Sequence, residues 1–150
     1  MSEKIDVVNK ETNAIMQVLS AYKVAIYEKN INAFIELYDS NARVFDTWNI
    51  WLYENVDARS PVINAWLGGL GSERVTVNFD NVLVTHSDDL AMVTAVGTYA
   101  AMSLEGVELR SMQNRFTWAL RFSDKGWKII HEHTSVPIAN DLTAKLIRDL

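Results

Sequence analysis

The chain has 150 residues, 49% of them hydrophobic, and its 14 Lys and Arg against 19 Asp and Glu leave a net charge of −5 at pH 7. This length favours one soluble domain over residues 1–150 that buries about 68–70% of its unfolded surface. The absence of cysteine excludes disulfide scaffolds, Cys-ligated zinc, iron–sulfur clusters and thiol nucleophiles. Without basic runs or a long apolar stretch, we expect no nucleic-acid partner, no membrane and a cytoplasmic location.

The first half of the chain predicts three helices. Apolar residues with helical spacing predict one over residues 12–29, followed after Asn30 by a short one that stops near residues 39–41. Residues 42–46 then favour a short strand. A third helix is predicted from an N-cap at Ser60, with proline at the next position, to the glycines at 68 and 69.

The second half predicts an antiparallel meander of four strands, because the apolar spacing changes to two and short turns separate the segments. The strands are expected from residue 75 to 84, 90 to 102, 107 to 122 and 127 to 136. The alternation slips by one residue at 80–81, which indicates a bulge. Residues 140–150 favour a final helix packed on a neighbouring element or on another copy.

The last hairpin predicts which side chains face the interior. A four-residue loop over 123–126 places Phe122 opposite Trp127, and opposed residues share a face of the sheet. Continued with strict alternation, this register pairs Trp118 with His131 and Phe116 with His133. It also pairs Asn114 with Ser135 on that inner face and leaves Arg115 and Glu132 outside as a surface or interface pair.

The order helix, helix, strand, helix, meander resembles the nuclear transport factor 2-like (NTF2-like) superfamily. The resemblance implies an α+β cone, with three N-terminal helices packed on a curved antiparallel sheet that encloses a pocket. Residues 126–137 (GWKIIHEHTSVP) resemble the G-K-W-x-x-x-H-x-H-x-S-x-x-P region of SnoaL-like proteins and of the calcium/calmodulin-dependent kinase association domain. The superfamily includes isomerases, cyclases, dehydratases, transport factors and oligomerisation modules, so the fold alone does not define the chemistry.

A second resemblance, to ketosteroid isomerase, implies a mechanism. Tyr22 and Asp46 fall where that enzyme has its oxyanion-binding tyrosine and its base, with similar residues between them. Trp118 stands where the second, protonated acid is expected, so steroid isomerisation is not expected. An indole N–H can still donate one hydrogen bond, and His131 opposite could donate or shuttle a proton.

These residues form the candidate catalytic set, with Asp46 as base, Tyr22 as donor to an oxyanion, and His131 or His133 as proton shuttle. Two alternatives remain open, since Tyr22 could be a core residue with a satisfied hydroxyl and Asp46 could be a turn or cap residue. The two histidines could ligate a metal with Asp46, but a lone pair is weak support, and we predict no metal and no cofactor.

The ligand expected in the pocket is a small apolar or aromatic organic molecule. An aromatic cluster after residue 46 could form a wall for a flat ligand or simply fill the core. The predicted ligand-binding residues are Trp48, Tyr53, Trp66, Asn114, Phe116, Trp118 and Ser135, and Trp51 belongs to the same aromatic cluster.

The sequence thus predicts a small-molecule-binding protein, an isomerase, cyclase or dehydratase if it is an enzyme, that performs acid–base chemistry next to a carbonyl group. The alternative is a non-catalytic ligand-sensing or oligomerisation module similar to the kinase association domain. We expect a homodimer formed through the outer face of the sheet, whereas an association module would assemble into a large ring.

Overall fold

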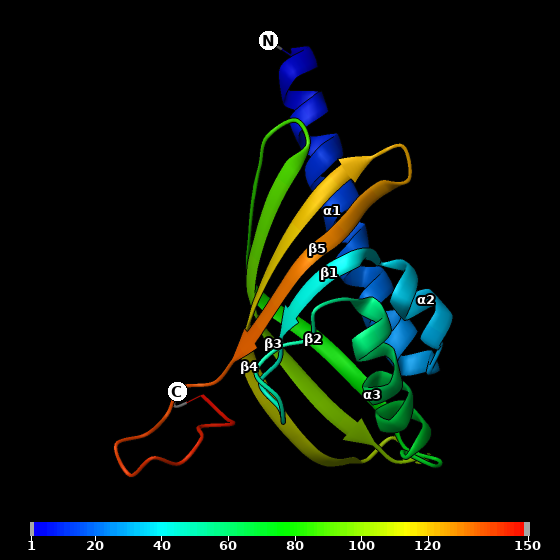
Figure 1. Cartoon of the computed structure of the whole chain (residues 1–150), viewed down its shortest axis with the longest axis vertical. Helices are drawn as coiled ribbons and strands as arrows, with labels where there is room; N and C mark the ends of the chain where they lie inside the picture. The colour runs from blue at the N-terminus through cyan, green and yellow to red at the C-terminus, as the bar shows by residue number, and fades with distance from the viewer. Residues whose placement is uncertain (1, 149–150) are drawn as a thin grey trace.

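The computed structural model describes residues 2–148, with side chains from residue 10 onward. It is an α+β structure in which a curved five-stranded sheet wraps around three helices, as predicted (Figure 1). No helix in the described part of the chain combines the length and apolar composition needed to cross a bilayer.

Helix α1, Ser2–Glu28, is the longest helix and lies against the sheet. Its buried stripe, including Ile15, Tyr22 and Ile26, follows the predicted spacing, although the helix begins ten residues earlier than expected. The helix ends where Lys29 adopts a left-handed conformation with φ 57°. Helix α2, Ile31–Glu36, follows directly.

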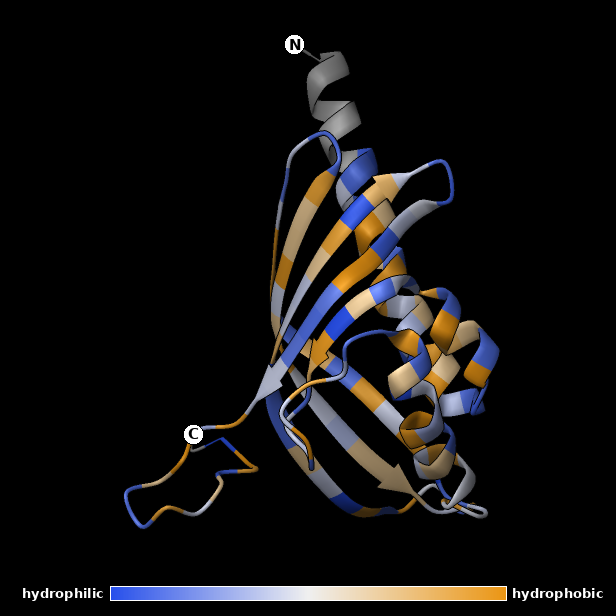
Figure 2. Cartoon of the chain, viewed as in Figure 1, coloured by the Kyte–Doolittle hydropathy of each residue, from blue (hydrophilic) through white to orange (hydrophobic). Residues whose placement is uncertain are grey.

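The sheet has the order β1-β5-β4-β3-β2. Strands β2 (Arg74–His86), β3 (Leu90–Met102), β4 (Glu108–Ser123) and β5 (Gly126–Ser135) form the predicted antiparallel meander. Strand β1, Tyr38–Phe45, adds a parallel edge beside β5, so the sheet is mixed rather than purely antiparallel. Hydrophobic and hydrophilic residues alternate along these strands, which gives the sheet an apolar inner face under the helices (Figure 2).

Strand β2 contains the predicted bulge. Its register against β3 shifts between Asp80 and Leu83, and Asn81 adopts a left-handed conformation with φ 52°. Bulges increase local bending and twist, so this shift helps the long strand follow the curvature of the sheet.

Helix α3, Val56–Gly68, begins one turn earlier than predicted. The Asn55 side chain accepts the hydrogen bond from the Ala58 N–H at 2.9 Å and is therefore the N-cap in place of Ser60. The Ser60 hydroxyl instead donates to the Val56 carbonyl oxygen. This early start places Arg59 inside the helix, on the side that faces the sheet.

A second bulge, in β5, overturns the predicted inner face. Leu120 still pairs with Ile129, but Ala119 pairs with His131, so Ile130 is an extra residue in β5. An extra residue reverses the alternation beyond it. Trp118 therefore pairs with Glu132, and the predictions that pair it with His131 and Phe116 with His133 are wrong.

The helix predicted over residues 140–150 is also wrong for the described residues 140–148, while 149–150 lie outside the described part of the chain. Strand β5 ends opposite Arg115, so it leaves the adjoining edge of β4 open. The Gln113 N–H on that edge donates to the Leu146 carbonyl at 2.6 Å, and Arg148 forms an ion pair with Asp80 at 2.7 Å. The tail is therefore held by the edge of β4 and by Asp80 of β2, and it does not form a helix.

Candidate functional site

A pocket of about 520 Å³ opens between the inner face of the sheet, helices α1 and α3, and the loop after β1. This volume is within the usual range for small-molecule sites. Its lining is mostly apolar with a few polar groups. The lining residues used below are Tyr22, Asp46, Trp48, Tyr53, Arg59, Trp66, Tyr99, Asn114, Glu132 and Thr134.

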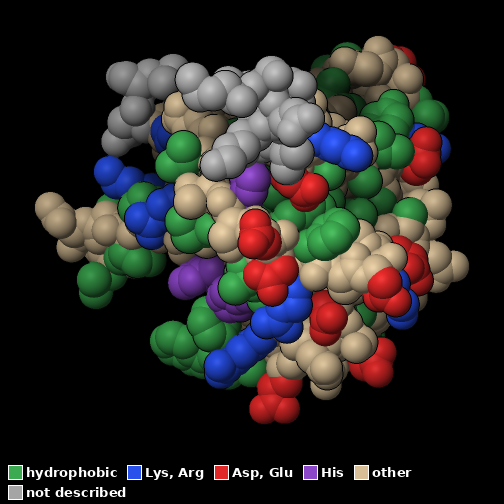
Figure 3. Space-filling view, turned by 90° about the horizontal axis from the view of Figure 1, so that it is seen from above, with side chains coloured by type: hydrophobic (Ala, Val, Ile, Leu, Met, Phe, Trp, Pro, Cys, Tyr) green, Lys and Arg blue, Asp and Glu red, His purple; other side chains and the backbone are tan. Residues whose placement is uncertain are grey.

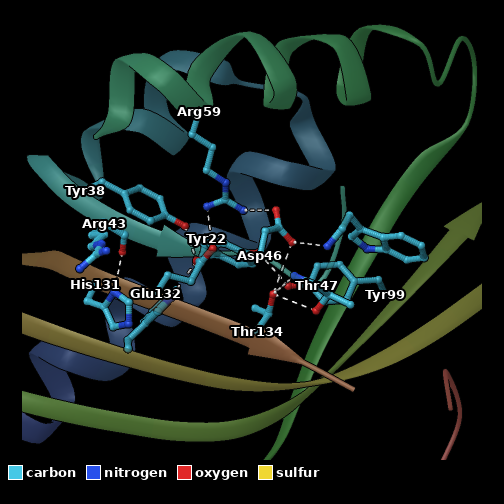
Figure 4. A network of polar contacts seen from close by, with 12 residues as sticks. Tyr22, Tyr38, Arg43, Asp46, Thr47, Arg59, Tyr99, His131, Glu132 and Thr134 are labelled. Atoms are coloured by element: carbon cyan, nitrogen blue, oxygen red, sulfur yellow. Dashed lines mark hydrogen bonds and ion pairs between the residues drawn. The ribbon is translucent and has the colours of Figure 1, made fainter. Parts of the chain in front are cut away.

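Glu132 is the most buried charged group of the pocket, with 0% of its surface exposed. One carboxylate oxygen accepts hydrogen bonds from the Tyr38 hydroxyl at 2.5 Å and the Trp118 indole N–H at 3.0 Å. The other oxygen accepts a 2.6 Å bond from Arg59 (Figure 4). A buried carboxylate needs such donors to replace water, and here they come from a helix and two strands.

Arg59 connects Glu132 to Asp46. Its second terminal nitrogen lies 3.3 Å from an Asp46 carboxylate oxygen. Burial alone lowers the pKa of the Arg59 guanidinium, but the charge of Glu132 and its other neighbours outweighs this and raises the pKa well above its ordinary value. The cation therefore stays charged between two carboxylates, and it orients Asp46 toward the pocket.

Asp46 directly follows β1 and is loosely held at the pocket surface, with 15% of its side chain exposed. Its other oxygen accepts from the Thr134 hydroxyl and from the Trp48 N–H, both at 3.4 Å. The Thr47 N–H and hydroxyl both bond the Thr134 oxygen at 3.0 Å, which steadies this side of the site. Long bonds and partial exposure leave the Asp46 carboxylate accessible to a ligand.

Tyr22 and Tyr99 form a hydroxyl pair in the same pocket, with their oxygens 2.7 Å apart. Burial, followed by the nearby Tyr99 and Glu132, raises the pKa of Tyr22 well above its ordinary value, and burial does the same for Tyr99. Both hydroxyls therefore stay protonated. One proton joins the two oxygens, and the other is available to a ligand.

An aromatic floor supports this pair. The Tyr22 ring lies 5.7 Å from Phe116 and 5.4 Å from Trp118, both at edge-to-face angles. These two residues were expected to contact a ligand, but they are almost fully buried and lie beneath the pocket rather than in its lining. The Trp118 indole N–H is occupied by Glu132 and does not take the place of a second acid facing the pocket.

His131 and His133 do not face the pocket, which contradicts the predicted inner position. His133 is exposed, and the His131 ring nitrogen Nδ1 lies 2.6 Å from the Arg43 carbonyl oxygen, with both rings packed against Phe45. The space-filling view shows histidine side chains at the molecular surface (Figure 3). The extra residue in β5 explains this result, since it turns both imidazoles outward.

The extra residue in β5 also turns Ser135 to the outer face of the sheet. Its hydroxyl bonds the Arg115 side chain at 3.0 Å, so it is absent from the pocket lining. The expected pairing of Arg115 with Glu132 on the outer face is therefore wrong as well.

The other predicted residues reach the pocket: Tyr22, Asp46, Trp48, Tyr53, Trp66 and Asn114. Sequence reasoning missed the charged and hydroxyl partners Arg59, Glu132, Tyr38, Tyr99 and Thr134. Arg59 could have been found from Asn55, which is as good an N-cap as Ser60. A helix that begins after Asn55 includes Arg59. No local signal marked the extra residue that turns Glu132 inward.

Within the described residues, no three His, Asp or Glu side chains gather closely enough to hold a metal ion.

Two buried side-chain atoms of the described chain have no hydrogen-bond partner, and both belong to residues of this pocket. They are Nε of Arg59 and Oδ1 of Asn114. Buried polar atoms are nearly always paired, so an unpaired one beside a pocket requires a partner that a water molecule or a ligand in the pocket can supply.

Comparison with known proteins supports the fold. Residues 15–139 match the sequence profile of the SnoaL-like domain. No curated protein matches the chain. An NTF2-like protein of unknown function from Pseudomonas putida is 19% identical, with a TM-score of 0.81 over 95% of this chain and 98% of that one.

Two further structures are similar. An NTF2-like protein with a cystatin-like fold from Novosphingobium aromaticivorans is 12% identical, with a TM-score of 0.76 over 94% of this chain and 91% of that one. A Xanthomonas campestris protein named as a candidate calcium/calmodulin-dependent protein kinase II association domain is 18% identical, with a TM-score of 0.68 over 81% and 84%. At these identities, the structures share a fold with this chain.

Proposed function

Because the chain belongs to the family of SnoaL-like domains, we propose that its pocket binds a small organic molecule and performs acid–base chemistry next to a carbonyl group. Isomerisation, cyclisation and dehydration all fit this chemistry. The observation that carries the proposal is that one pocket presents both an accessible carboxylate, Asp46, and a protonated hydroxyl pair, Tyr22 with Tyr99. Removing a proton beside a carbonyl needs these two kinds of group.

In this proposal Asp46 is the base. Among the described acidic residues that line the pocket, Asp46 is partly exposed and Glu132 is enclosed by three donors. The ion pair with Arg59 at 3.3 Å and the bond from Thr134 at 3.4 Å are long, but together they favour a carboxylate orientation toward the pocket. A base positioned beside the ligand in this way loses less freedom when the reaction begins.

The hydroxyl pair is the proposed site for the carbonyl oxygen. As negative charge develops on that oxygen, it can accept the free proton of the Tyr22–Tyr99 pair. The pKa values of both tyrosines are raised, so both hydroxyls keep their protons and can act as hydrogen-bond donors. Charge stabilisation by donors held in advance is among the largest contributions to enzyme rates.

The apolar walls define the rest of the ligand. Trp48, Tyr53 and Trp66 line the pocket on the side of the β1–α3 loop and α3. Aromatic side chains offer wide, rigid contact surfaces, so they favour a flat or aromatic ligand. We therefore propose that the ligand is mainly apolar and carries a ketone.

Acetylnaphthalene, a flat aromatic ketone, tests this chemistry. In deuterated buffer, the protein is expected to speed the exchange of its acetyl methyl protons, which NMR follows directly. Asp46→Asn should still bind the probe but lose about 10²–10⁴-fold in exchange rate. Tyr22→Phe should lose about 10²–10³-fold, whereas Tyr27→Phe, an exposed tyrosine on the same helix, should behave as the parent.

The same experiment decides the alternative of a non-catalytic sensing or association module. That alternative is favoured by one observation, namely that both Asp46 oxygens already accept bonds from the protein. It predicts binding without exchange, and equal exchange in parent and Asp46→Asn would show that Asp46 is not the base. The expected homodimer stays a prediction, which the mass of the protein in solution would test.

A further inference from the structure

Asn114 lies on the inner face of β4 and lines the pocket, but nothing in the described structure accounts for its polarity. The residue is 8% exposed, and its buried Oδ1 has no hydrogen-bond partner. The amide of the neighbouring residue Gln113 lies on the other face of the sheet, and both its nitrogen and its oxygen form hydrogen bonds there. It donates to the Thr98 hydroxyl at 3.0 Å and accepts from the Arg148 N–H at 2.8 Å.

Strand β3, which pairs with β4 at this point, leaves space for the Asn114 side chain. Gly97, in the middle of β3, pairs directly with Asn114. A Cβ at Gly97 would lie 3.1 Å from the Asn114 Oδ1 and 3.2 Å from a ring carbon of Tyr99. Glycine inside a strand weakens it and often marks a close approach of another group. Here it leaves room for the Asn114 amide beside Tyr99, at the edge of the proposed carbonyl site.

A buried amide without a partner destabilises a fold, because it loses the hydrogen bonds to water that it has in the unfolded chain. Such a residue makes physical sense when a bound molecule supplies the missing bond. An asparagine amide has an acceptor end and a donor end, and rotation about its last side-chain bond exchanges the two. A ligand hydroxyl is the simplest group that satisfies either end.

We propose that Asn114 is a specificity-determining residue that selects pocket ligands bearing a hydroxyl group. The ligand is thus a flat, mainly apolar molecule with a hydroxyl that lies against β4, next to Tyr99. The proposal rests on the ligand-binding part of the proposed function and not on the chemistry assigned to Asp46. It therefore needs a test that measures binding alone.

The test uses two matched probes, acetylnaphthalene and its hydroxylated analogue acetylnaphthol, with affinities measured by fluorescence titration. The parent protein is expected to bind acetylnaphthol about tenfold more tightly, which corresponds to one hydrogen bond in a buried site. Asn114→Leu should bind both probes alike. Gln113→Leu, the same kind of change on the opposite face, should keep the tenfold preference.

A second readout separates a ligand-binding role from a structural one without any probe. If the Asn114 amide serves a ligand, Asn114→Leu should leave the urea midpoint of unfolding unchanged or raised, because an apolar group replaces an unpaired polar one. Gln113→Leu should lower the midpoint, because it breaks two bonds.

Three results would overturn the proposal: equal affinities of the parent for the two probes, a preference that survives in Asn114→Leu, or a midpoint that falls as far in Asn114→Leu as in Gln113→Leu. Loss of proton exchange in the earlier experiment would leave it intact. The two proposals can therefore fail separately.

Discussion

The Arg59 guanidinium donates a 2.6 Å hydrogen bond to the Glu132 carboxylate in a place where Glu132 has no contact with solvent. This pair joins α3 to β5 across the base of the pocket. It also determines where Asp46 lies, since the same guanidinium holds that carboxylate. The stability of the fold and the geometry of the site therefore depend on one buried ion pair.

Glu132→Ala is expected to lower the free energy of unfolding by about 3–5 kcal/mol, because it leaves the Arg59 cation buried with only Asp46 as a charged partner. Urea denaturation followed by circular dichroism measures this. Glu73→Ala is the matched control, since it breaks an exposed ion pair with Arg110 and should change stability little. If both variants lost the same free energy of unfolding, the buried Arg59–Glu132 pair would contribute no more to stability than an exposed ion pair.

Alkaline pH is expected to unfold the protein through its buried tyrosines. Burial raises the pKa of Tyr22, Tyr38 and Tyr99 above the value of about 10 found in unfolded chains. Below that pH both states hold these protons, so these three tyrosines add no pH dependence to stability. Above it the unfolded state releases them first, so stability falls by about 1.4 kcal/mol per pH unit for each tyrosine.

Urea midpoints measured at rising pH check this prediction, with tyrosinate absorbance recorded in the same samples. We expect the tyrosinate signal of Tyr22, Tyr38 and Tyr99 to appear together with unfolding. A complete tyrosinate signal in a protein that still shows its folded circular dichroism spectrum would contradict the prediction.

Replacing the outward-facing histidines should not affect the pocket. His131→Ala and His133→Ala are expected to match the parent in probe affinity and in exchange rate, because both rings lie on the other side of the sheet. The cost of His131→Ala is limited to the hydrogen bond with Arg43, about 0.5–1.5 kcal/mol in stability. A His131→Ala variant that folds but has lost exchange would place the imidazole in the site after all.

Gly97→Ala should destabilise the protein by about 1–3 kcal/mol, because the new Cβ meets the Asn114 amide and the Tyr99 ring at less than normal contact distance. A double-mutant cycle tests the cause. In an Asn114→Ala background the cost of Gly97→Ala should be smaller, since one of the two close contacts is gone. If the effects of Gly97→Ala and Asn114→Ala on stability were additive, the contact between the new Cβ and the Asn114 amide would not be the cause of the destabilisation.

Much of the architecture follows from local patterns. The stripe of α1 and the alternation of β3 depend on neighbouring residues and on the repeat of each element, so both were predictable. The same holds for the slip near Asp80, which appears in the sequence as a change of parity. Asp46 and Tyr22 were found because a family resemblance pointed to them.

The identity of the charged group inside the cone was not predictable in this way. The bulge at Ile130 lies within an unbroken apolar pair, Ile129 and Ile130, so no change of pattern marks the extra residue. Whether Glu132 or His131 faces the pocket depends on which of them finds partners there. Arg59, from a helix more than seventy residues away in the sequence, provides a 2.6 Å bond and a positive charge, which favour a carboxylate over an imidazole at this position.

Local periodicity thus accounts for the three helices and the meander, and the family resemblance accounts for Tyr22 and Asp46. The polar interior was decided by contacts between segments far apart in the chain. Burying a carboxylate is favourable only when several donors surround it, and those donors come together only when the sheet closes around the helices.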